Sequence, residues 1–347
     1  MRASRAHSPL VLRLVPCVAG LAALLACAPA AAAEARVLRL GHFPNVTHAQ
    51  ALYARAGGQF EKAVGVPIEW TSFNAGPTAI EAMFAHAVDA TFVGPNPAIN
   101  GYLKSRGQEF VIVAGAASGG AGLVVRPDAG IESDRDFGGK IIATPQLGNT
   151  QDVAARRWFA ERGYKLREKG GNLTLLALSN PDQLTLFRKK QIDGAWTVEP
   201  WLSRLELEGG GRLYLDEKTL WPGGQYVITH LIVSREFLAG SPGLVEKLLG
   251  ALVAVTQEIN AGKPAAAQIL NAELKKETGK ALPPAVLDRA LGRVDLTWDP
   301  LPASLRHCAQ AAHEVGFLRD APDLRGIYAL QILNRVLDER HLPPVVE

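Results

Sequence analysis

The sequence predicts an α/β protein built of two similar lobes. Two related segments carry this prediction, Val88 to Pro97 and Ile192 to Trp201. When Asp89 is aligned with Asp193, both segments read as an aliphatic residue, Asp, small residues or Thr, an aromatic residue, and a turn that contains Pro. Each follows a run with helical apolar spacing, so a strand–turn–helix unit occurs in both halves. We therefore expect two lobes whose turns face each other across a cleft for a small molecule.

The bulk composition is that of a large globular protein. The chain has 347 residues, of which 48% are hydrophobic and 20% charged, which is enough for two domains with a substantial core. Lys and Arg exceed Asp and Glu by three, and three basic residues precede Glu34. The remainder is therefore formally neutral, which gives no support for a nucleic-acid or anionic-membrane surface.

Residues 1–33 read as a secretory signal peptide, which predicts a periplasmic location. Arg2, Arg5 and Arg13 form a positive n-region, the run from Leu14 to Ala26 is an apolar h-region, and the alanines at 30–33 suit signal peptidase. The apolar run is too short to be read as a retained membrane span.

The cysteines leave a second interpretation of this segment open. Leu24-Leu25-Ala26-Cys27 loosely resembles a lipobox, in which Cys27 would become a lipid-anchored N-terminus. If cleavage instead follows the alanines, Cys308 alone remains and no intramolecular disulfide can form. Export without disulfides suits a large, well-cored protein.

Lobe 1 is predicted to begin with residues 34–122, in three strand–turn–helix units. The expected strands are Arg36 to His42, Val66 to Thr71 and the strand within Val88 to Pro97, and Phe110 to Ala116 adds a fourth. Thr47 is the expected cap of a helix from about His48 to Phe60. Successive units of this kind make parallel strands, whose turns at 42–48, 72–77 and 94–97 share one edge of the sheet. Ligands bind at that edge in open α/β sheets.

Lobe 2 is predicted over residues 123–228, after a glycine-rich crossing at 115–122. Ser118 and Gly119 could offer backbone N–H groups to a ligand there. The stretch does not match the dinucleotide-binding pattern G-x-G-x-x-G, and it leads into a strand instead of a helix. We therefore prefer to interpret it as a crossing between the lobes. Strands are expected at Lys140 to Thr144 and Leu173 to Leu178. Helices are expected from Gln151 to about Arg162 and after Ser179, which has cap chemistry.

The chain is predicted to return to lobe 1 over residues 229–347. We interpret Tyr226 to Ser234 as the return crossing, and expect no strands after Arg235. Helical spacing covers the rest, and these helices are expected to pack on lobe 1.

Five segments, taken together and in this order, resemble a known family: periplasmic solute-binding proteins of ABC importers, of the nitrate/sulfonate/taurine group that shares its fold with thiamine-precursor binding proteins. The segments are Gly41 to Leu52, Phe73 to Pro77, Val93 to Ala98, Leu147 to Asp152 and Glu199 to Trp201. The resemblance covers nearly the whole chain after the leader, and it is far more specific for the fold than for the ligand.

The resemblance implies a two-lobed type II periplasmic-binding fold with two crossing strands as a hinge. It implies that a small ligand lies between the lobes, that the lobes close on it, and that it is delivered to a membrane permease with its cytoplasmic ATPase. The ligand would be a small organosulfonate such as taurine or an alkanesulfonate, or a related oxyanion. A thiamine-type pyrimidine precursor, nitrate or phosphonate remain alternatives. We expect a monomer that carries no cofactor and no metal.

The turns supply the candidate ligand contacts. Helix N-termini present unpaired N–H groups and the positive end of the dipole, so they hold anions without a basic side chain. An Asn in each of four turns can recognise a polar head group, although Asn also suits turns and caps. The candidate ligand-binding residues are Phe43, Asn45, Thr47, His48, Asn74, Gly76, Gly94, Pro95, Asn96, Ser118, Gly119, Gly148, Asn149, Thr150, Glu199 and Trp201.

Glu199 is ambiguous within this set. In the cleft, its carboxylate would repel an anion and favour an amine-bearing ligand such as taurine. Alternatively it pairs with Arg126 or Arg204, or caps the helix that begins near Pro200. We prefer a capping or hinge role.

Other classes find less support in the sequence. An exported enzyme is the main rival, but no G-x-S-x-G elbow, H-E-x-x-H helix or P-loop is present. His42, His48 and His230 could in principle share a metal, yet their spacing matches no metal motif.

Overall fold

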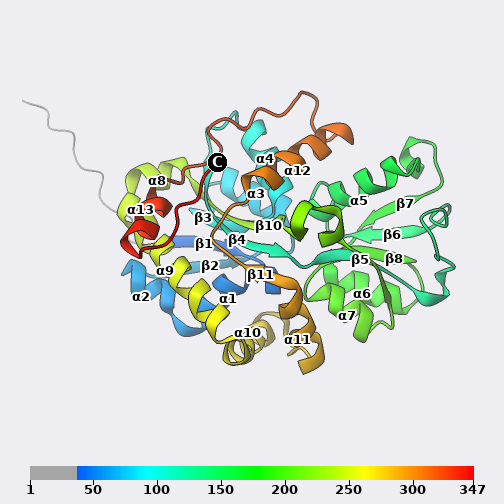
Figure 1. The fold of residues 1–347 in the computed structure, drawn as a ribbon, viewed down its shortest axis with the longest axis horizontal. Coiled ribbons are helices and arrows are strands. Elements are labelled where there is room, and N and C mark those ends of the chain that lie inside the picture. Colours follow the sequence, from blue (N-terminus) through cyan, green and yellow to red (C-terminus); the bar gives the residue numbers. More distant parts are fainter. Residues whose placement is uncertain (1–36) are drawn as a thin grey trace, which may run out of the picture. The chain divides into compact units, whose positions relative to one another are not determined.

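The computed structural model describes residues 37–347, which contain two β-sheets with helices packed around them (Figure 1). The predicted signal peptide, with Cys27, lies outside the described residues. We call the six-stranded sheet and its helices lobe 1, and the five-stranded sheet and its helices lobe 2. This is the two-lobed α/β architecture that the sequence predicts.

The lobe 1 sheet has the strand order β11-β4-β10-β3-β1-β2. β1 pairs in parallel with both β2 and β3, as the strand–turn–helix units predict, while β10 runs antiparallel between β3 and β4. The strands are β1 (Leu38–His42), β2 (Ile68–Ser72), β3 (Ala90–Val93), β4 (Phe110–Gly119), β10 (Val227–Ser234) and β11 (Val294–Leu296).

The lobe 2 sheet has the order β7-β6-β8-β5-β9. β6 pairs in parallel with β7 and β8, and β5 pairs antiparallel with β8 and β9. The strands are β5 (Ala121–Val125), β6 (Ile141–Thr144), β7 (Thr174–Ala177), β8 (Gly194–Val198) and β9 (Arg212–Asp216). Trp196 on β8 is fully buried in the core of this lobe.

The α-helices are α1 (Ala49–Gly57), α2 (Gln59–Val64), α3 (Gly76–Phe84), α4 (Pro95–Lys104), α5 (Thr150–Glu161), α6 (Asn180–Arg188), α7 (Trp201–Leu207), α8 (Arg235–Gly240), α9 (Pro242–Ala261), α10 (Lys263–Thr278), α11 (Pro284–Arg293), α12 (Pro302–Glu314) and α13 (Gln331–Glu339). The predicted cap at Ser179 is confirmed, since its hydroxyl accepts the N–H of Asp182.

The repeated Asp of the two related segments has a structural explanation. The carboxylate of Asp89 accepts the backbone N–H of Arg39, and that of Asp193 accepts the backbone N–H of Ile141, both at 2.8 Å. Each Asp also pairs with an arginine, Arg39 or Arg126. The Asp therefore ties the start of one parallel strand to its neighbour in each lobe, at the edge away from the turns.

The chain crosses between the sheets at Gly120 and again between β9 and β10. Gly119 and Gly120 have φ of +78° and +76°, in the left-handed region. A Cβ on Gly119 would lie 2.7 Å from the carbonyl oxygen of Arg293, so a side chain has no room there. The predicted return crossing was wrong: β10 lies wholly in the lobe 1 sheet, and residues 217–226, which we call the return segment, make the crossing instead.

Two further predictions are corrected. The helix expected over 48–60 is broken at Gly58, whose φ is +65°, and it is preceded by a 3₁₀ turn at Val46–His48, so Thr47 does not cap it. A strand does follow Arg235: β11 pairs with the end of β4. Apolar spacing over three residues carries too little signal to reveal such a strand.

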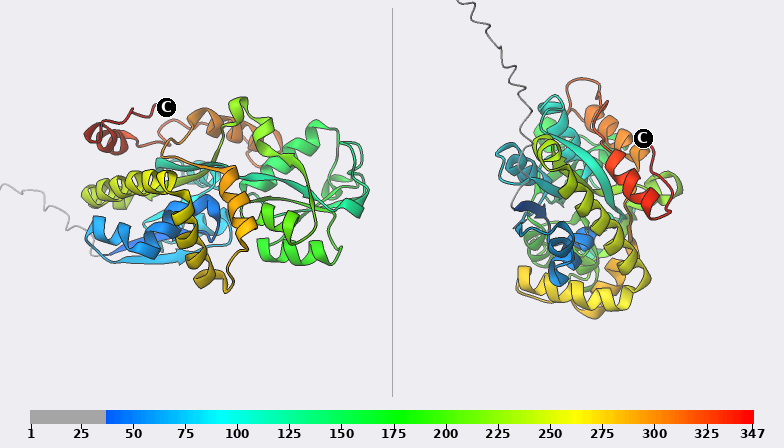
Figure 2. Two further views of the ribbon diagram at one scale, coloured as in Figure 1. Left: turned by 60° about the horizontal axis from the view of Figure 1, so that its bottom comes forward. Right: turned by 90° about the vertical axis from the view of Figure 1, so that its left-hand side faces the viewer.

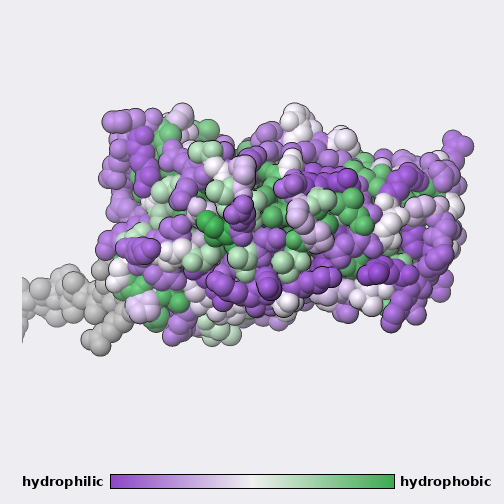
Figure 3. All heavy atoms as spheres, turned by 90° about the horizontal axis from the view of Figure 1, so that it is seen from below, coloured by the Kyte–Doolittle hydropathy of each residue, from purple (hydrophilic) through white to green (hydrophobic). Residues whose placement is uncertain are grey.

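The C-terminal helices do not all serve one lobe. α9 packs on α2, and α10 packs on α1, which covers lobe 1 (Figures 1 and 2). α11 contacts α7 and α12 contacts α5, so both also reach lobe 2. The face carrying α10 and α11 is mainly hydrophilic, with apolar residues in small groups (Figure 3). Within residues 37–347, no helix combines the length and apolarity needed to cross a bilayer.

Candidate functional site

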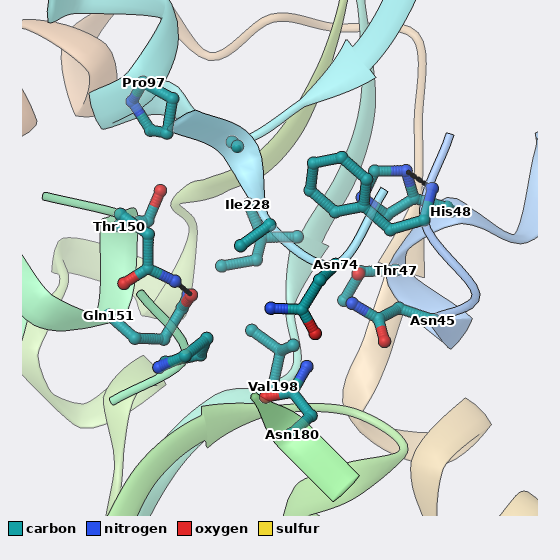
Figure 4. Close-up of a pocket in the computed structure, with 16 residues that line it drawn as sticks. Asn45, Thr47, His48, Asn74, Pro97, Thr150, Gln151, Asn180, Val198 and Ile228 are labelled. Atoms are coloured by element: carbon teal, nitrogen blue, oxygen red, sulfur yellow. Dashed lines mark hydrogen bonds between the residues drawn. The ribbon is translucent and has the colours of Figure 1, made fainter. Parts of the chain in front are cut away.

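A cavity lies between the two sheets, where the turns that follow their strands meet (Figure 4). Its volume is about 30 Å³, room for only a few water molecules. Its lining consists of Phe43, Asn45, Thr47, His48, Asn74, Ala75, Gly76, Gly94, Pro97, Pro145, Asn149, Thr150, Gln151, Asn180, Val198 and Ile228.

The structure brings a majority of the candidate residues to this cavity. Those in its lining are Phe43, Asn45, Thr47, His48, Asn74, Gly76, Gly94, Asn149 and Thr150. They come from the ends of β1, β2 and β3 in lobe 1 and from the turn after β6 in lobe 2. This follows from the parallel pairing of those strands, whose carboxyl ends share an edge.

Four helices begin at the cavity: α3, α4, α5 and α6. The first turns of α3 and α4 receive no side-chain cap, so the backbone N–H groups that they have are not satisfied by a cap; Pro77, Pro95 and Pro97 carry none. Gly76 fits because a Cβ there would lie 2.3 Å from Cγ of Pro97, which shows how closely the two helix starts approach. The converging helix dipoles make the cavity electropositive without a basic residue.

The start of α5 is held by a buried carboxylate. Asp152 accepts hydrogen bonds from the backbone N–H of Gly148 at 2.9 Å and from the hydroxyl of Thr144 at 3.0 Å, and it pairs with Arg156. The side chain of Asn149 caps the helix by accepting the N–H of Asp152. These bonds fix the turn that carries Asn149 and Thr150 into the cavity.

Side-chain amides add donors to the cavity. Oδ1 of Asn45 accepts the indole N–H of Trp201 at 3.2 Å, and Oδ1 of Asn180 accepts the hydroxyl of Thr197 at 3.1 Å. Oε1 of Gln151 accepts the amide of Asn149 at 3.0 Å. In Asn45, Asn180 and Gln151 the oxygen is thus used within the chain, while the NH₂ group has no partner in the described chain. An acceptor-rich ligand complements such a set.

His48 is a neutral donor in this environment. Its Nδ1 accepts the backbone N–H of Phe43 at 3.3 Å, so the neutral ring carries its proton on Nε2. The ring stacks on Phe43 with centroids 4.3 Å apart. Burial, and secondarily the proximity of His42, lowers the pKa of His48 well below its usual value. The cavity lining therefore contains no formally charged side chain.

The remaining candidates lie outside the lining. Pro95 and Asn96 begin α4 behind it, and the amide of Asn96 donates to the carbonyl of Cys308 at 3.2 Å. Ser118 and Gly119 end β4 at the crossing. Gly148 precedes Asn149 with its N–H bound to Asp152, and Trp201 reaches the site only through its bond to Asn45.

Glu199 is fully buried, and its carboxylate is occupied. It accepts from the backbone N–H of Ser203 at 3.1 Å and from its hydroxyl at 2.8 Å, and it pairs with Arg293 at 3.1 Å. Burial raises the pKa of Glu199, and the bonds from Ser203 and Arg293 oppose this. Of the alternatives, pairing with Arg126 or Arg204 was wrong, since these bind Asp193 and Glu208. The observed role is to cap α7 and to join it to α11.

Sequence reasoning missed several lining residues: Ala75, Pro97, Pro145, Gln151, Asn180, Val198 and Ile228. Gln151 is the second residue of α5, and Asn180 is the first residue of α6. The rule that helix N-termini at the strand ends face the ligand, which was used for the other helices, could have found them. Val198 and Ile228 are apolar strand residues with no local signal. Among residues 37–347 no group of three or more His, Cys, Asp or Glu side chains could hold a metal ion.

The two-lobed fold, with a polar cavity at the strand ends of both sheets, is that of a type II periplasmic solute-binding protein. The chain belongs to the NMT1-like family, whose model matches residues 31–274. It is 23% identical over 196 residues to the taurine-binding periplasmic protein of Escherichia coli (strain K12), a match that covers 56% of this chain and 58% of that protein.

Solved structures share the fold. The alkanesulfonate-binding protein from Xanthomonas axonopodis pv. citri bound to MOPS matches with a TM-score of 0.71 and 22% identity, over 86% of this chain and all of that chain. The periplasmic nitrate-binding protein from Synechocystis PCC 6803 matches with a TM-score of 0.77 and 15% identity, over 89% and 90% of the two chains. At these identities the likeness establishes the architecture alone.

Proposed function

We propose that this protein is the extracytoplasmic binding component of an ABC importer and that it binds a short-chain organosulfonate, or a related oxyanion, in the cavity between its lobes. The lobes open to admit the ligand, close around it, and present it to a membrane permease. The family, and the sulfonate, taurine and nitrate proteins that resemble this chain, support the class of ligand.

The observation that carries the proposal is the convergence of four helix N-termini on a cavity without charged side chains. A sulfonate has three acceptor oxygens and needs several donors. Helix N–H groups, the NH₂ groups of Asn180 and Gln151, and Nε2 of His48 provide them. A compact anion is held by such dipoles without the desolvation cost of burying a basic side chain.

We propose further that an unsubstituted alkanesulfonate is preferred over taurine. The ammonium group of taurine requires a carboxylate or several acceptors, and the lining offers no carboxylate. Glu199, the one acidic candidate, is already bound to Arg293 and Ser203. Val198, Ile228 and Pro97 provide an apolar wall for a short hydrocarbon tail.

Calorimetric titration of the purified protein tests this proposal. We expect one-site binding of methanesulfonate and ethanesulfonate, taurine weaker by about tenfold, which corresponds to about 1.4 kcal/mol, and still weaker binding of a hexyl chain. Nitrate, ethylphosphonate and a thiamine-type pyrimidine are the comparison ligands. If taurine binds more tightly than ethanesulfonate, or only the pyrimidine binds, the ligand assignment is wrong. Turnover of any ligand into product would point to an exported enzyme.

A further inference from the structure

A second, larger cavity lies on the other side of Thr150. It has a volume of about 210 Å³ and is bordered by α5 of lobe 2, α12 of lobe 1 and the return segment. Helices α5 and α12 lie side by side in Figure 1 and pack against each other. A dry engineered cavity of about 150 Å³ suffices to bind benzene in another protein, so this one has room for a monocyclic molecule.

The walls of this cavity are largely apolar. Val153, Ala154, Leu220, Ala311 and the rings of Trp158 and Trp221 line it. The indole Nε1 of Trp158 is buried and has no hydrogen-bond partner among the described residues. The hydroxyl of Thr150, which borders both cavities, is likewise unpaired. Unsatisfied buried polar groups of this kind are uncommon in folded proteins.

A buried carboxylate faces the same space. Glu217, on the return segment, lines the cavity and is 2% exposed. Its Oε2 accepts the indole N–H of Trp196 at 2.8 Å, and the indole N–H of Trp221 also donates to this carboxylate. Among the described residues Glu217 forms no ion pair. Its neighbour Asp216 is also acidic, so it adds negative charge and does not compensate that of Glu217. A buried carboxylate without a cation normally has a specific reason, such as a ligand that brings one.

The other charges around the cavity do not provide that cation. Arg157 lies in the lining, but its Nε is 2.9 Å from the carboxylate of Glu161 and 3.2 Å from that of Glu314, close enough for ion pairing although neither contact has hydrogen-bond geometry. It also contacts Nε2 of His307, and burial followed by the charge of Arg157 lowers the pKa of that imidazole. Arg157 is thus offset by two carboxylates, which leaves the cavity with an excess of negative charge.

We propose that this cavity is a second binding site, for a small amine with an apolar or aromatic body, whose ammonium group pairs with Glu217 and whose body packs on Trp158 and Trp221. Cations are also attracted to the faces of such indole rings. The site does not depend on the identity of the ligand between the sheets. Because its lining comes from both lobes and from the segment that joins them, an occupant would also bridge the two lobes.

Titration of the purified protein with phenethylamine at about pH 8 tests the site. We expect one molecule to bind, and the similar-sized anion 3-phenylpropionate to bind at least tenfold more weakly. Glu217→Gln keeps an acceptor for Trp196 but removes the charge, so it should weaken phenethylamine binding at least tenfold. The matched control is Glu132→Gln, an exposed carboxylate in lobe 2 whose loss should leave binding unchanged.

A second variant keeps the test decisive if Glu217→Gln does not fold. Ala154 is partly buried in the wall, so Ala154→Leu fills the cavity without touching Glu217. It should abolish phenethylamine binding while leaving the affinity for ethanesulfonate within about twofold. The proposal is overturned if phenethylamine does not bind the wild-type protein, if the anion binds as well, or if Ala154→Leu binds phenethylamine normally.

Discussion

The indole N–H of Trp201 donates to Oδ1 of Asn45 across 3.2 Å, and this bond joins the start of α7 in lobe 2 to the first turn of lobe 1. Because an indole N–H only donates, it orients the Asn45 amide with its NH₂ group available to the cavity. Trp201 thus influences the site without lining it. Its ring is held in place by the guanidinium of Arg204, 4.4 Å from the ring centre.

Trp201→Phe should therefore weaken ligand binding while largely preserving the packing. The loss of one net hydrogen bond of about 1 kcal/mol corresponds to a roughly fivefold increase in the Kd for ethanesulfonate. Calorimetry on Trp70→Phe gives the matched control, because Trp70 donates to Glu61 at 2.7 Å within lobe 1 alone. Equal effects in the two variants would contradict a role of the Asn45 contact in closure.

Gly94→Ala should obstruct closure of the lobes. Gly94 has a φ of −71°, which alanine adopts freely, so any effect is steric. The new Cβ would lie 2.6 Å from Oγ1 of Thr150 on the opposite lobe. We expect affinity for the ligand to fall at least tenfold. In the double variant, Thr150→Ala removes that oxygen and should recover part of the lost affinity. If the double variant binds the ligand no better than Gly94→Ala alone, the clash is not the cause.

Ligand affinity should not depend on pH between about 6 and 8. The pKa of His48 is held well below 6.5 by burial, so the imidazole stays neutral over this range. Binding of ethanesulfonate that strengthens steadily as the pH falls from 8 to 6 would mean that a cationic His48 contacts the anion. His48→Phe should weaken binding through loss of the Nε2 donor, and this loss should be the same at both ends of the range.

Glu217 should make the folded protein less stable as the pH rises. Burial raises the pKa of its carboxyl group from 4.5 to about 7, and hydrogen bonds from the indole N–H groups of Trp196 and Trp221 oppose this rise. In the unfolded chain this carboxyl group releases its proton at lower pH. Its contribution to the free energy of unfolding is therefore fully present below about pH 4.5 and is lost as the pH rises through 7. The loss is on the order of 3 kcal/mol.

Denaturant unfolding of the wild-type protein and of Glu217→Gln at several pH values measures this contribution. The difference in free energy of unfolding between the two should shift in favour of the variant between pH 4.5 and 7, and be constant above about pH 8. A difference that does not change with pH would show that Glu217 titrates normally in the folded protein.

The architecture and much of the site follow from sequence because parallel strands impose a common edge. The residues after β1, β2, β3 and β6 reach the cavity for that reason, including Asn45, Asn74 and Gly94. What local reasoning misses depends on partners distant in the chain. The carboxylate of Glu199 pairs with Arg293 and does not line the cavity, and Arg293 is 94 residues away on a helix of the other lobe. Ile228 enters the lining only because β10 pairs with β3.

The return strand was misplaced for a related reason. Val227–Ser234 is rich in β-forming residues and follows lobe 2 in the chain. This pattern fits either a crossing between the lobes or a strand inserted into the lobe 1 sheet. Only its pairing with both β3 and β4 decides for the inserted strand. In the same way, the repeated Asp at 89 and 193 marks a duplicated unit correctly, but only its partners show that it stabilises each sheet at the edge away from the turns.

The uncharged lining of the cavity also affects how the protein responds to salt. Dissolved ions screen interactions between charged groups over about 10 Å at 0.1 M and about 3 Å at 1 M. The partial charges at helix starts act only within the first turn of the helix, a shorter distance than the screening length at 0.1 M. The affinity for an anion there should therefore depend less on ionic strength than the affinity of a site built from exposed charged side chains. A protein outside the cytoplasmic membrane meets the salinity of its surroundings, and this cavity would keep collecting its ligand in dilute and in salty water alike.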